Sequence, residues 1–91
     1  MKSELIIHDK VTHAGGIVEV KVWRVPRTED KPYGFKYSLV YIIEGVRVIG
    51  YDNAEGKGDH KHSKGRETAY RFASVRKLIE DFFREVNSYE G

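Results

Sequence analysis

The sequence contains no cysteine, and this absence excludes several classes of protein at once. Without thiols the chain cannot form disulfides, bind zinc or iron–sulfur clusters through thiolates, or use a cysteine nucleophile. Long apolar runs are also missing, since the longest, Leu39–Ile43, is far shorter than the roughly 20 residues of a membrane-spanning helix. Residues 1–8 contain no apolar run long enough for a signal-peptide core. We therefore expect a soluble, cytoplasmic protein.

The chain is small and its charges are nearly balanced. It has 91 residues, of which 40% are apolar and 33% are charged, and its formal net charge is +2. This length supports one modest core, so we expect a single domain over residues 1–91. A protein that coats nucleic acid would be more basic. The charge is uneven, however, because residues 57–66 hold four basic side chains and one acidic side chain, which favours a local phosphate contact.

Alternating apolar and polar residues predict about five antiparallel strands. The clearest strand runs from Phe35 to Ile43, and the Glu44-Gly45 break after it predicts a hairpin. The glycines within residues 9–16 and the charge cluster of residues 27–34 predict connecting segments. The predicted strands cover residues 4–8, 17–25, 35–43, 46–52 and 67–72.

The last predicted element is an amphipathic helix. Ser74 is a good N-cap residue, and apolar side chains follow it at spacings of three and four. Phe82 lies in the middle of this stripe and should be buried against the sheet, whereas Phe83 lies near its edge. Together these elements predict the α+β class, with an antiparallel sheet of about five strands and one C-terminal helix packed on one face. The apolar stripe comprises Val75, Leu78, Ile79, Phe82, Phe83 and Val86.

One helix covers only one face of such a sheet, so the other face needs an explanation. The residue pattern predicts a central hairpin that is apolar on both faces. One face carries Phe35, Tyr37, Leu39 and Tyr41, and the other carries Val40, Ile42, Ile49 and Tyr51. An uncovered apolar face of this size usually binds a partner. The alternative is that the N-terminal strand and the long loops fold over it.

The densest polar cluster lies between Tyr51 and Glu67, and it permits three interpretations. The first is a metal site, because His60 and His62 point the same way in an extended chain. A carboxylate could join them, and the candidates are Asp52, Asp59 and Glu67. Two histidines without a strong third ligand are nevertheless a weak signal. We therefore predict no metal and no other cofactor.

The second interpretation is general acid–base catalysis on RNA. Cleavage without a metal needs a base for the 2′-hydroxyl, an acid for the leaving 5′-oxygen and cations for the phosphate. His60 and His62 are the candidate acid and base, since histidine titrates near neutrality. Asp52 or Glu67 would orient an imidazole or act as base. The predicted phosphate-binding residues are Lys57, Lys61, Lys64 and Arg66.

The third interpretation is structural. Asp52 and Asn53 follow a predicted strand, where such side chains commonly hydrogen-bond to the backbone and shape a turn. His8 and His13 have no companion ligands near them in the sequence, and we assign them no role. Trp23 fits either an exposed anchor for a partner or a residue that the fold covers.

Several motifs in the second half of the chain resemble the TumE family. The Tyr51-Asp52-Asn53 and His60-Lys61-His62 pieces, in this order and at this separation, are the most specific. The similarity covers residues 35–87 and extends more loosely to the N-terminal strands. The matching segments are residues 37–41, 46–54 and 58–62, then Glu67, Tyr70 and Phe72, and finally residues 78–82.

The resemblance implies a biological role but supplies no mechanism. TumE-type proteins are toxins of prokaryotic toxin–antitoxin pairs, and their antitoxin carries a helix-turn-helix domain. Small toxins of this layout are similar to the RelE-like messenger-RNA endonucleases, which is an analogy at the level of the fold. We therefore expect a toxin that acts as a metal-independent ribonuclease, with RNA and a helix-turn-helix antitoxin as partners. The alternatives are a non-catalytic protein that binds a helix-turn-helix partner through its open sheet face, and a metal-dependent hydrolase. The open face could also form a homodimer.

Overall fold

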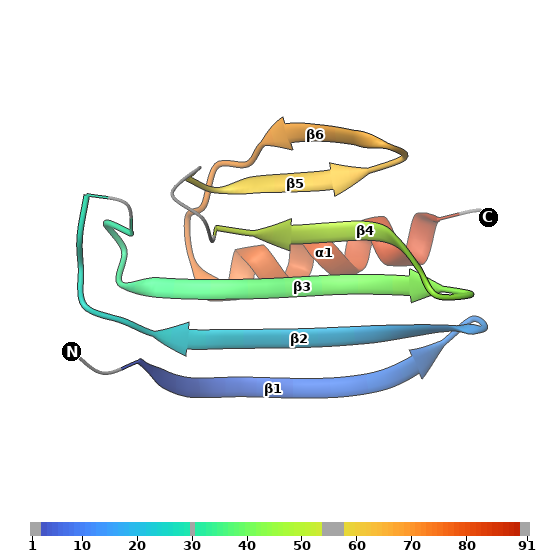
Figure 1. Ribbon diagram of the computed structural model, residues 1–91, viewed down its shortest axis with the longest axis horizontal. Helices are drawn as coiled ribbons and strands as arrows, with labels where there is room; N and C mark the ends of the chain where they lie inside the picture. Colours follow the sequence, from blue (N-terminus) through green and yellow to red (C-terminus); the bar gives the residue numbers. More distant parts are fainter. Residues whose placement is uncertain (1–2, 30, 54–57, 90–91) are drawn as a thin grey trace.

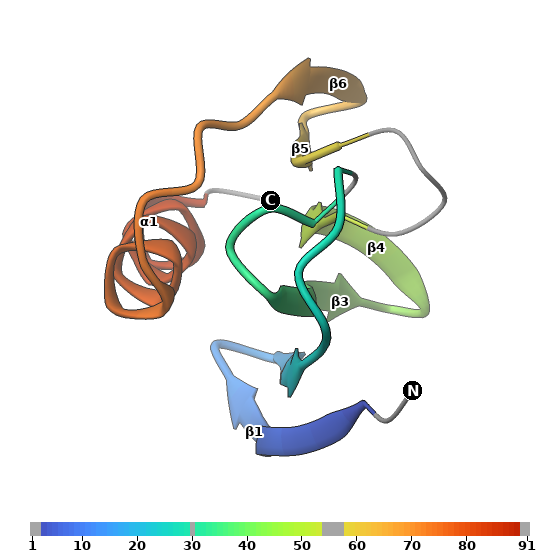
Figure 2. The ribbon, with the colours of Figure 1, turned by 90° about the vertical axis from the view of Figure 1, so that its left-hand side faces the viewer.

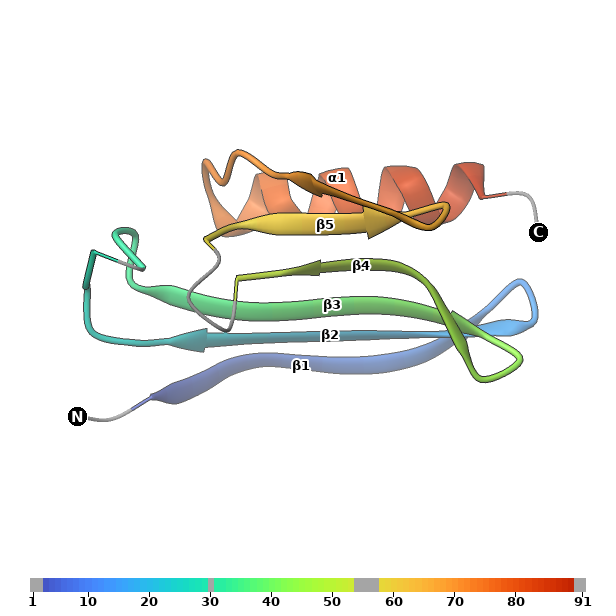
Figure 3. The same ribbon diagram turned by 45° about the horizontal axis from the view of Figure 1, so that its top comes forward.

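A computed structural model describes residues 3–29, 31–53 and 58–89 of the chain. The described residues form one antiparallel sheet of six strands and one helix, so the predicted α+β class is confirmed with one strand more than expected (Figure 1). Each strand pairs with the next one along the chain (Figure 3). The elements are β1 (Glu4–His13), β2 (Gly16–Arg24), β3 (Phe35–Ile43), β4 (Val46–Asp52), β5 (His60–Ser63), β6 (Arg66–Ala69) and α1 (Val75–Ser88).

Tight turns make this meander possible. The Ala14-Gly15, Glu44-Gly45 and Lys64-Gly65 pairs all have positive φ at both residues, which is the backbone of the type I′ hairpin turn. The sequence predicted the Glu44-Gly45 hairpin and a turn within residues 9–16, but not the Lys64-Gly65 turn. The segment predicted as a turn from Asp9 onward continues β1 as far as His13, because its backbone pairs with β2 residue by residue. The Lys64-Gly65 turn likewise creates β5, a strand that the sequence pattern did not predict.

The helix lies across one face of the sheet, as predicted. Seen along the strands, the sheet curves from β1 to β6 and α1 lies on one side of it (Figure 2). The Ser74 side chain caps the helix by accepting a hydrogen bond from the Lys77 amide at 3.1 Å. Leu78, Phe82 and Val86 are buried against the sheet, and Phe83 is half-buried. Among the described residues, no helix combines the length and the apolar character that crossing a membrane would require.

The pairing of β3 with β4 corrects the prediction for the second face of the sheet. Leu39 lies opposite Tyr51, and Tyr41 lies opposite Ile49. Directly opposed residues of antiparallel strands share a face, so Ile49 and Tyr51 face the helix and are buried there. The sequence analysis had placed them on the face opposite Leu39 and Tyr41, together with Val40 and Ile42.

A β-bulge is the physical reason for this difference. Ile42 pairs with Arg47 and Tyr41 pairs with Ile49, so Val48 is an extra residue on β4. A regular hairpin from the Glu44-Gly45 turn would instead pair Val40 with Ile49. A shift by one residue moves every later side chain to the other face. The uncovered face, which we call the open face, consequently carries Gly50 and Asp52 from β4 in place of two apolar side chains.

Candidate functional site

The four predicted catalytic residues lie together on the open face. His60 and His62 are two residues apart on β5, so both point away from the helix. Asp52 on β4 lies directly opposite His60, and Glu67 on β6 lies directly opposite His62. Three neighbouring strands therefore bring these four side chains into one cluster, which we call the histidine site.

Each imidazole of the histidine site contacts a carboxylate. His60 Nε2 lies 3.1 Å from Asp52 Oδ1 and 3.7 Å from Glu67 Oε2. His62 Nε2 lies 3.2 Å from Glu67 Oε1. The two ring centroids are 6.2 Å apart, with the rings steeply inclined to each other. Two imidazoles at this separation can flank a single phosphodiester group.

The two histidines differ in exposure. His60 is buried, with 8% of its surface exposed. Its Nδ1 lies 3.1 Å from the Gly58 carbonyl oxygen, so both ring nitrogens face oxygen acceptors. Only the protonated imidazole donates from both nitrogens, and this arrangement fixes the orientation of the ring. The His62 side chain is 33% exposed and is the more accessible of the two.

The structure does not bring the predicted phosphate-binding residues to the histidine site. Lys61 alternates with the two histidines on β5 and points to the helix side, where its Nζ lies 2.8 Å from Glu85 Oε1. Arg66, opposite Ser63, shares that side. Lys64 is exposed in the turn between β5 and β6. Lys57 lies outside the described residues. Their phosphate-binding role stays a prediction, and the geometry of Lys61 and Arg66 does not favour it.

Arg47 is a cation near the histidine site that the sequence analysis missed. It pairs with Ile42 next to the bulge, and because Ile42 is on the open face, Arg47 lies there too. Its side chain extends over Gly50, because a methyl group at Gly50 would lie 3.0 Å from Arg47 Cδ and 3.2 Å from Nε. Gly50 is the β4 neighbour of His62, and side chains at opposed positions lie about 5 Å apart. The missing side chain at Gly50 thus leaves room for the Arg47 side chain over the β4 position opposed to His62.

Asn53 hydrogen-bonds to the backbone, as one interpretation expected, but its partners lie on β3 and not in a turn of its own. It is 3% exposed, its Nδ2 donates to the Phe35 carbonyl at 2.7 Å, and its Oδ1 accepts from the Tyr37 amide at 3.0 Å. The side-chain amide thereby continues the β3–β4 pairing past the end of β4. Asp59, a candidate metal ligand in the sequence analysis, accepts instead from the Tyr37 hydroxyl at 2.7 Å. Burial and this carboxylate raise the pKa of Tyr37.

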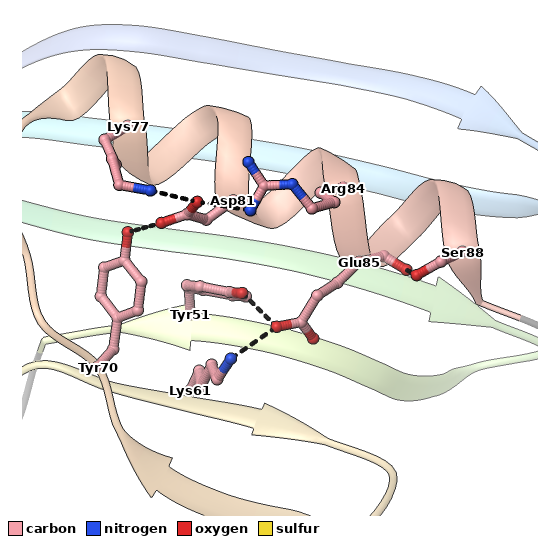
Figure 4. A network of polar contacts seen from close by, with 8 residues as sticks. All are labelled: Tyr51, Lys61, Tyr70, Lys77, Asp81, Arg84, Glu85 and Ser88. Atoms are coloured by element: carbon pink, nitrogen blue, oxygen red, sulfur yellow. Dashed lines mark hydrogen bonds and ion pairs between the residues drawn. The ribbon is translucent and has the colours of Figure 1, made fainter.

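A second polar network supports β5 from the helix side (Figure 4). Glu85 Oε1 accepts from the Tyr51 hydroxyl and from Lys61 Nζ, so one carboxylate joins α1, β4 and β5. Burial alone would favour the neutral acid, but the hydrogen bonds from Lys61 and Tyr51 outweigh it and lower the pKa of Glu85. A neighbouring carboxylate, Asp81, accepts from the Tyr70 hydroxyl at 2.7 Å. These contacts fix the strand that carries both histidines.

Within the described ranges, no group of three histidine or carboxylate side chains has an arrangement that could hold a metal ion. The histidine site holds two imidazoles and two carboxylates, but the carboxylates are directed at the imidazoles. Proton transfer is therefore the chemistry for which this constellation is best arranged.

Comparisons with known proteins assign the chain to a family. The family model described as Toxin TumE matches residues 1–90, nearly the whole chain. Searches of curated proteins and of solved structures gave no significant match. The match covers all six strands and the helix, including every residue of the histidine site. The chain therefore belongs to the TumE family of toxins.

Proposed function

We propose that this toxin cleaves RNA by general acid–base catalysis at His60 and His62, without a metal ion. One observation carries the proposal: two imidazoles with centroids 6.2 Å apart, each in contact with a carboxylate, lie side by side on the open face of the sheet. The family identifies a toxin, and the site chemistry supports RNA as its target.

In this mechanism the two histidines have different tasks. The Nε2–H of His62 donates to Glu67, which leaves Nδ1 to accept the proton of a ribose 2′-hydroxyl. The 2′-oxygen attacks the phosphorus, and the bond from phosphorus to the 5′-oxygen breaks. His60 supplies from its Nε2 the proton that the leaving 5′-oxygen takes up, and in this step the Nε2 contact with Asp52 is exchanged for a contact with the substrate. The products are a 2′,3′-cyclic phosphate and a 5′-hydroxyl end.

Arg47 supplies the cation that this reaction needs. Negative charge builds up on the non-bridging phosphate oxygens as the 2′-oxygen attacks. A guanidinium binds two such oxygens at once, and it keeps its charge at any physiological pH. Arg47 is exposed and its side chain lies over Gly50, the β4 residue opposed to His62, so we assign to it the phosphate-binding role that the sequence analysis gave to Lys57, Lys61, Lys64 and Arg66.

The test compares His62→Ala with a control, His13→Ala. His13 is the last residue of β1 and lies on the helix side of the sheet with Val11, away from the open face. We expect His62→Ala to lower the rate of RNA cleavage about 10²–10⁴-fold and to relieve growth arrest. His13→Ala should retain both activities, and circular dichroism should show that both variants fold.

Purified protein and a labelled single-stranded RNA give the biochemical readout. We expect cleavage to persist in excess chelator and to leave 2′,3′-cyclic phosphate and 5′-hydroxyl ends. Loss of cleavage with the chelator would contradict the metal-free mechanism. A folded His62→Ala protein that still arrests growth fully would contradict the catalytic role of the histidine site, and it would favour the non-catalytic interaction protein. The helix-turn-helix antitoxin and the homodimer stay predictions, which co-expression and sedimentation would test.

A further inference from the structure

The open face of the sheet continues from the histidine site across β3 and β2 to β1. Cross-strand pairing aligns one row of side chains perpendicular to the strands, in the order His60, Asp52, Ser38, Lys21 and His8. Beside this row, Trp23 on β2 lies directly opposite Lys36 on β3. The histidine site and the tryptophan therefore share one continuous surface.

Trp23 is the single tryptophan of the chain, and it is only partly buried. The Lys36 ammonium lies 5.1 Å from the centroid of its ring. Because this ammonium lies over the ring, a stacked nucleobase would take its place there and the lysine would move to the adjacent phosphate. Duplex RNA keeps its bases stacked inside the helix, so this arrangement suits a single strand.

The charges of β1, β2 and β3 on this face are mostly positive. Lys10, Lys21 and Lys36 lie on it, and Glu19 is the acidic side chain among them. Glu19 accepts from His8 and lies 3.8 Å from Lys21 Nζ. The hydrogen bond from His8, followed by the nearby lysines, lowers the pKa of Glu19, so this carboxylate is already matched by cations. Positive charge remains in excess, which complements a phosphate backbone.

The bulge at Val48 also bears on what this face can bind. It moves Ile49 and Tyr51 to the helix side and leaves Gly50 and Asp52 on the open face. An interface core between proteins is typically apolar and depleted in charge. The open face is more polar than the sequence pattern suggested, and that polarity favours a nucleic acid over a protein partner.

We propose that single-stranded RNA crosses the open face perpendicular to the strands, with a base stacked on Trp23 and phosphates bound by Lys36 and Lys21. This inference rests on the proposed ribonuclease function and extends it to the binding of the substrate. β2 and β5 are three strand spacings apart, roughly 14 Å, which a few nucleotides span. The RNA thus reaches the histidine site from the β2 side.

The single tryptophan permits a direct test on the unmodified protein. An oligonucleotide with 2′-O-methyl groups cannot be cleaved by this mechanism, so its binding is measured separately from catalysis. We expect titration with a single-stranded 2′-O-methyl RNA to quench the fluorescence of Trp23 and to saturate. A duplex of the same sequence should quench much less. No quenching by the single strand, or quenching only by a helix-turn-helix protein, would overturn the proposal.

Variants of the tryptophan and of its neighbouring lysine test the contacts individually. Trp23→Ala should weaken binding roughly 5- to 150-fold, as loss of one stacked base does, and Trp23→Phe should restore part of it. Lys36→Gln should weaken binding and reduce the slope of log affinity against log salt by about 0.7, because one phosphate contact is lost. Arg76→Gln is the matched control, since Arg76 is exposed on α1 on the other side of the sheet.

The outcomes separate this proposal from the proposed function. If RNA is cleaved but Trp23→Ala and Lys36→Gln bind RNA like the unmodified protein, the proposed RNA path is wrong and the proposed ribonuclease activity is supported. If both variants lose RNA binding but no RNA is ever cleaved, the proposed RNA path is supported and the proposed ribonuclease activity is wrong. If Trp23→Ala does not fold, the quenching experiment and Lys36→Gln decide the question on folded proteins.

Discussion

Glu85 is the side chain whose removal should most clearly reveal how the helix supports the histidine site. Its Oε1 accepts from the Tyr51 hydroxyl at 2.5 Å and from Lys61 Nζ at 2.8 Å. Glu85 is 24% exposed and Lys61 is 33% exposed at the side chain, so water replaces these contacts only in part. Glu85→Ala would leave a hydroxyl and an ammonium without their shared acceptor.

The size of the effect follows from these contacts. A hydrogen bond to a charged group contributes about 1.5–3 kcal/mol, and partial exposure of Glu85 and Lys61 reduces the sum of the two bonds. We expect Glu85→Ala to lower the free energy of unfolding by about 2–3 kcal/mol. In a domain of this size that corresponds to a fall in melting temperature of about 10–20 °C. Glu85→Gln should have a smaller effect, because its amide oxygen can still accept from Tyr51.

The same contacts predict a pH dependence. The pKa of Glu85 is lowered in the folded protein, from an ordinary value of 4.5. A carboxylate of this kind stabilises the fold fully above its unfolded pKa, and the stabilisation is lost as the pH falls through the folded pKa. Stability should therefore fall below about pH 4.5, and Glu85→Gln should remove the part of that fall due to this residue.

The assay is thermal unfolding by circular dichroism at pH 7 and at pH 3. Glu80→Ala is the matched control, because Glu80 lies on the same helix but is exposed, and its melting temperature should stay close to that of the unmodified protein. A Glu85→Ala protein that melts within about 2 °C of the unmodified chain at pH 7 would refute the reasoning.

Further predictions address the core, the hydrogen bonds of Asn53, the open face and metals. Phe82→Ala should cost about 3–5 kcal/mol and Phe83→Ala clearly less, which denaturant midpoints would measure, and equal costs would contradict the assignment of the buried face. Asn53→Ala should cost about 2–3 kcal/mol, because it leaves buried backbone groups of β3 without partners, and an unchanged midpoint would refute this role. Gly50→Ala should leave the melting temperature nearly unchanged but slow RNA cleavage by displacing Arg47, and undiminished cleavage would argue against the phosphate role of that arginine. A chelator should leave the melting temperature unchanged, whereas a large fall would indicate a structural metal.

The main elements of the fold could be predicted because their signals are local. The alternation along β3 and the stripe along α1 each reflect the period of one element packed on one core. The Ser74 cap and the burial of Phe82 follow from the same helical stripe and were both confirmed. Such signals depend on residues that are close in sequence.

The register between strands could not be predicted in this way. The bulge at Val48 is a relation between β3 and β4, and nothing in the alternation of either strand alone reveals it. β5 and β6 are only four residues long each, too short for a clear alternation. The position of Arg47 over Gly50 depends on the bulge, so it was missed as well.

The candidate site was predicted only in part, because strand pairing is not visible in the sequence. The spacing of His60 and His62 was enough to place both imidazoles on one face of an extended segment, and the structure has them there. The same spacing places Lys61 on the opposite face, so its distance from the imidazoles could have been recognised from the sequence. Which carboxylates meet the imidazoles depends on strand pairing, yet Asp52 and Glu67 were identified because a few acidic residues flank the histidines.

The alternation along β5 makes activity and stability separable within a single short strand. Loss of toxicity alone never identifies a catalytic residue, since an unfolded toxin is also inactive. In β5, however, His62 faces the open side, whereas its neighbour Lys61 bonds to Glu85 on the helix side. His62→Ala should therefore abolish cleavage with little change in melting temperature, and Lys61→Met should lower the melting temperature while cleavage persists below it. Two adjacent substitutions with opposite consequences would be hard to explain by general damage to the fold, and similar consequences from both would mean that β5 acts only as a structural element.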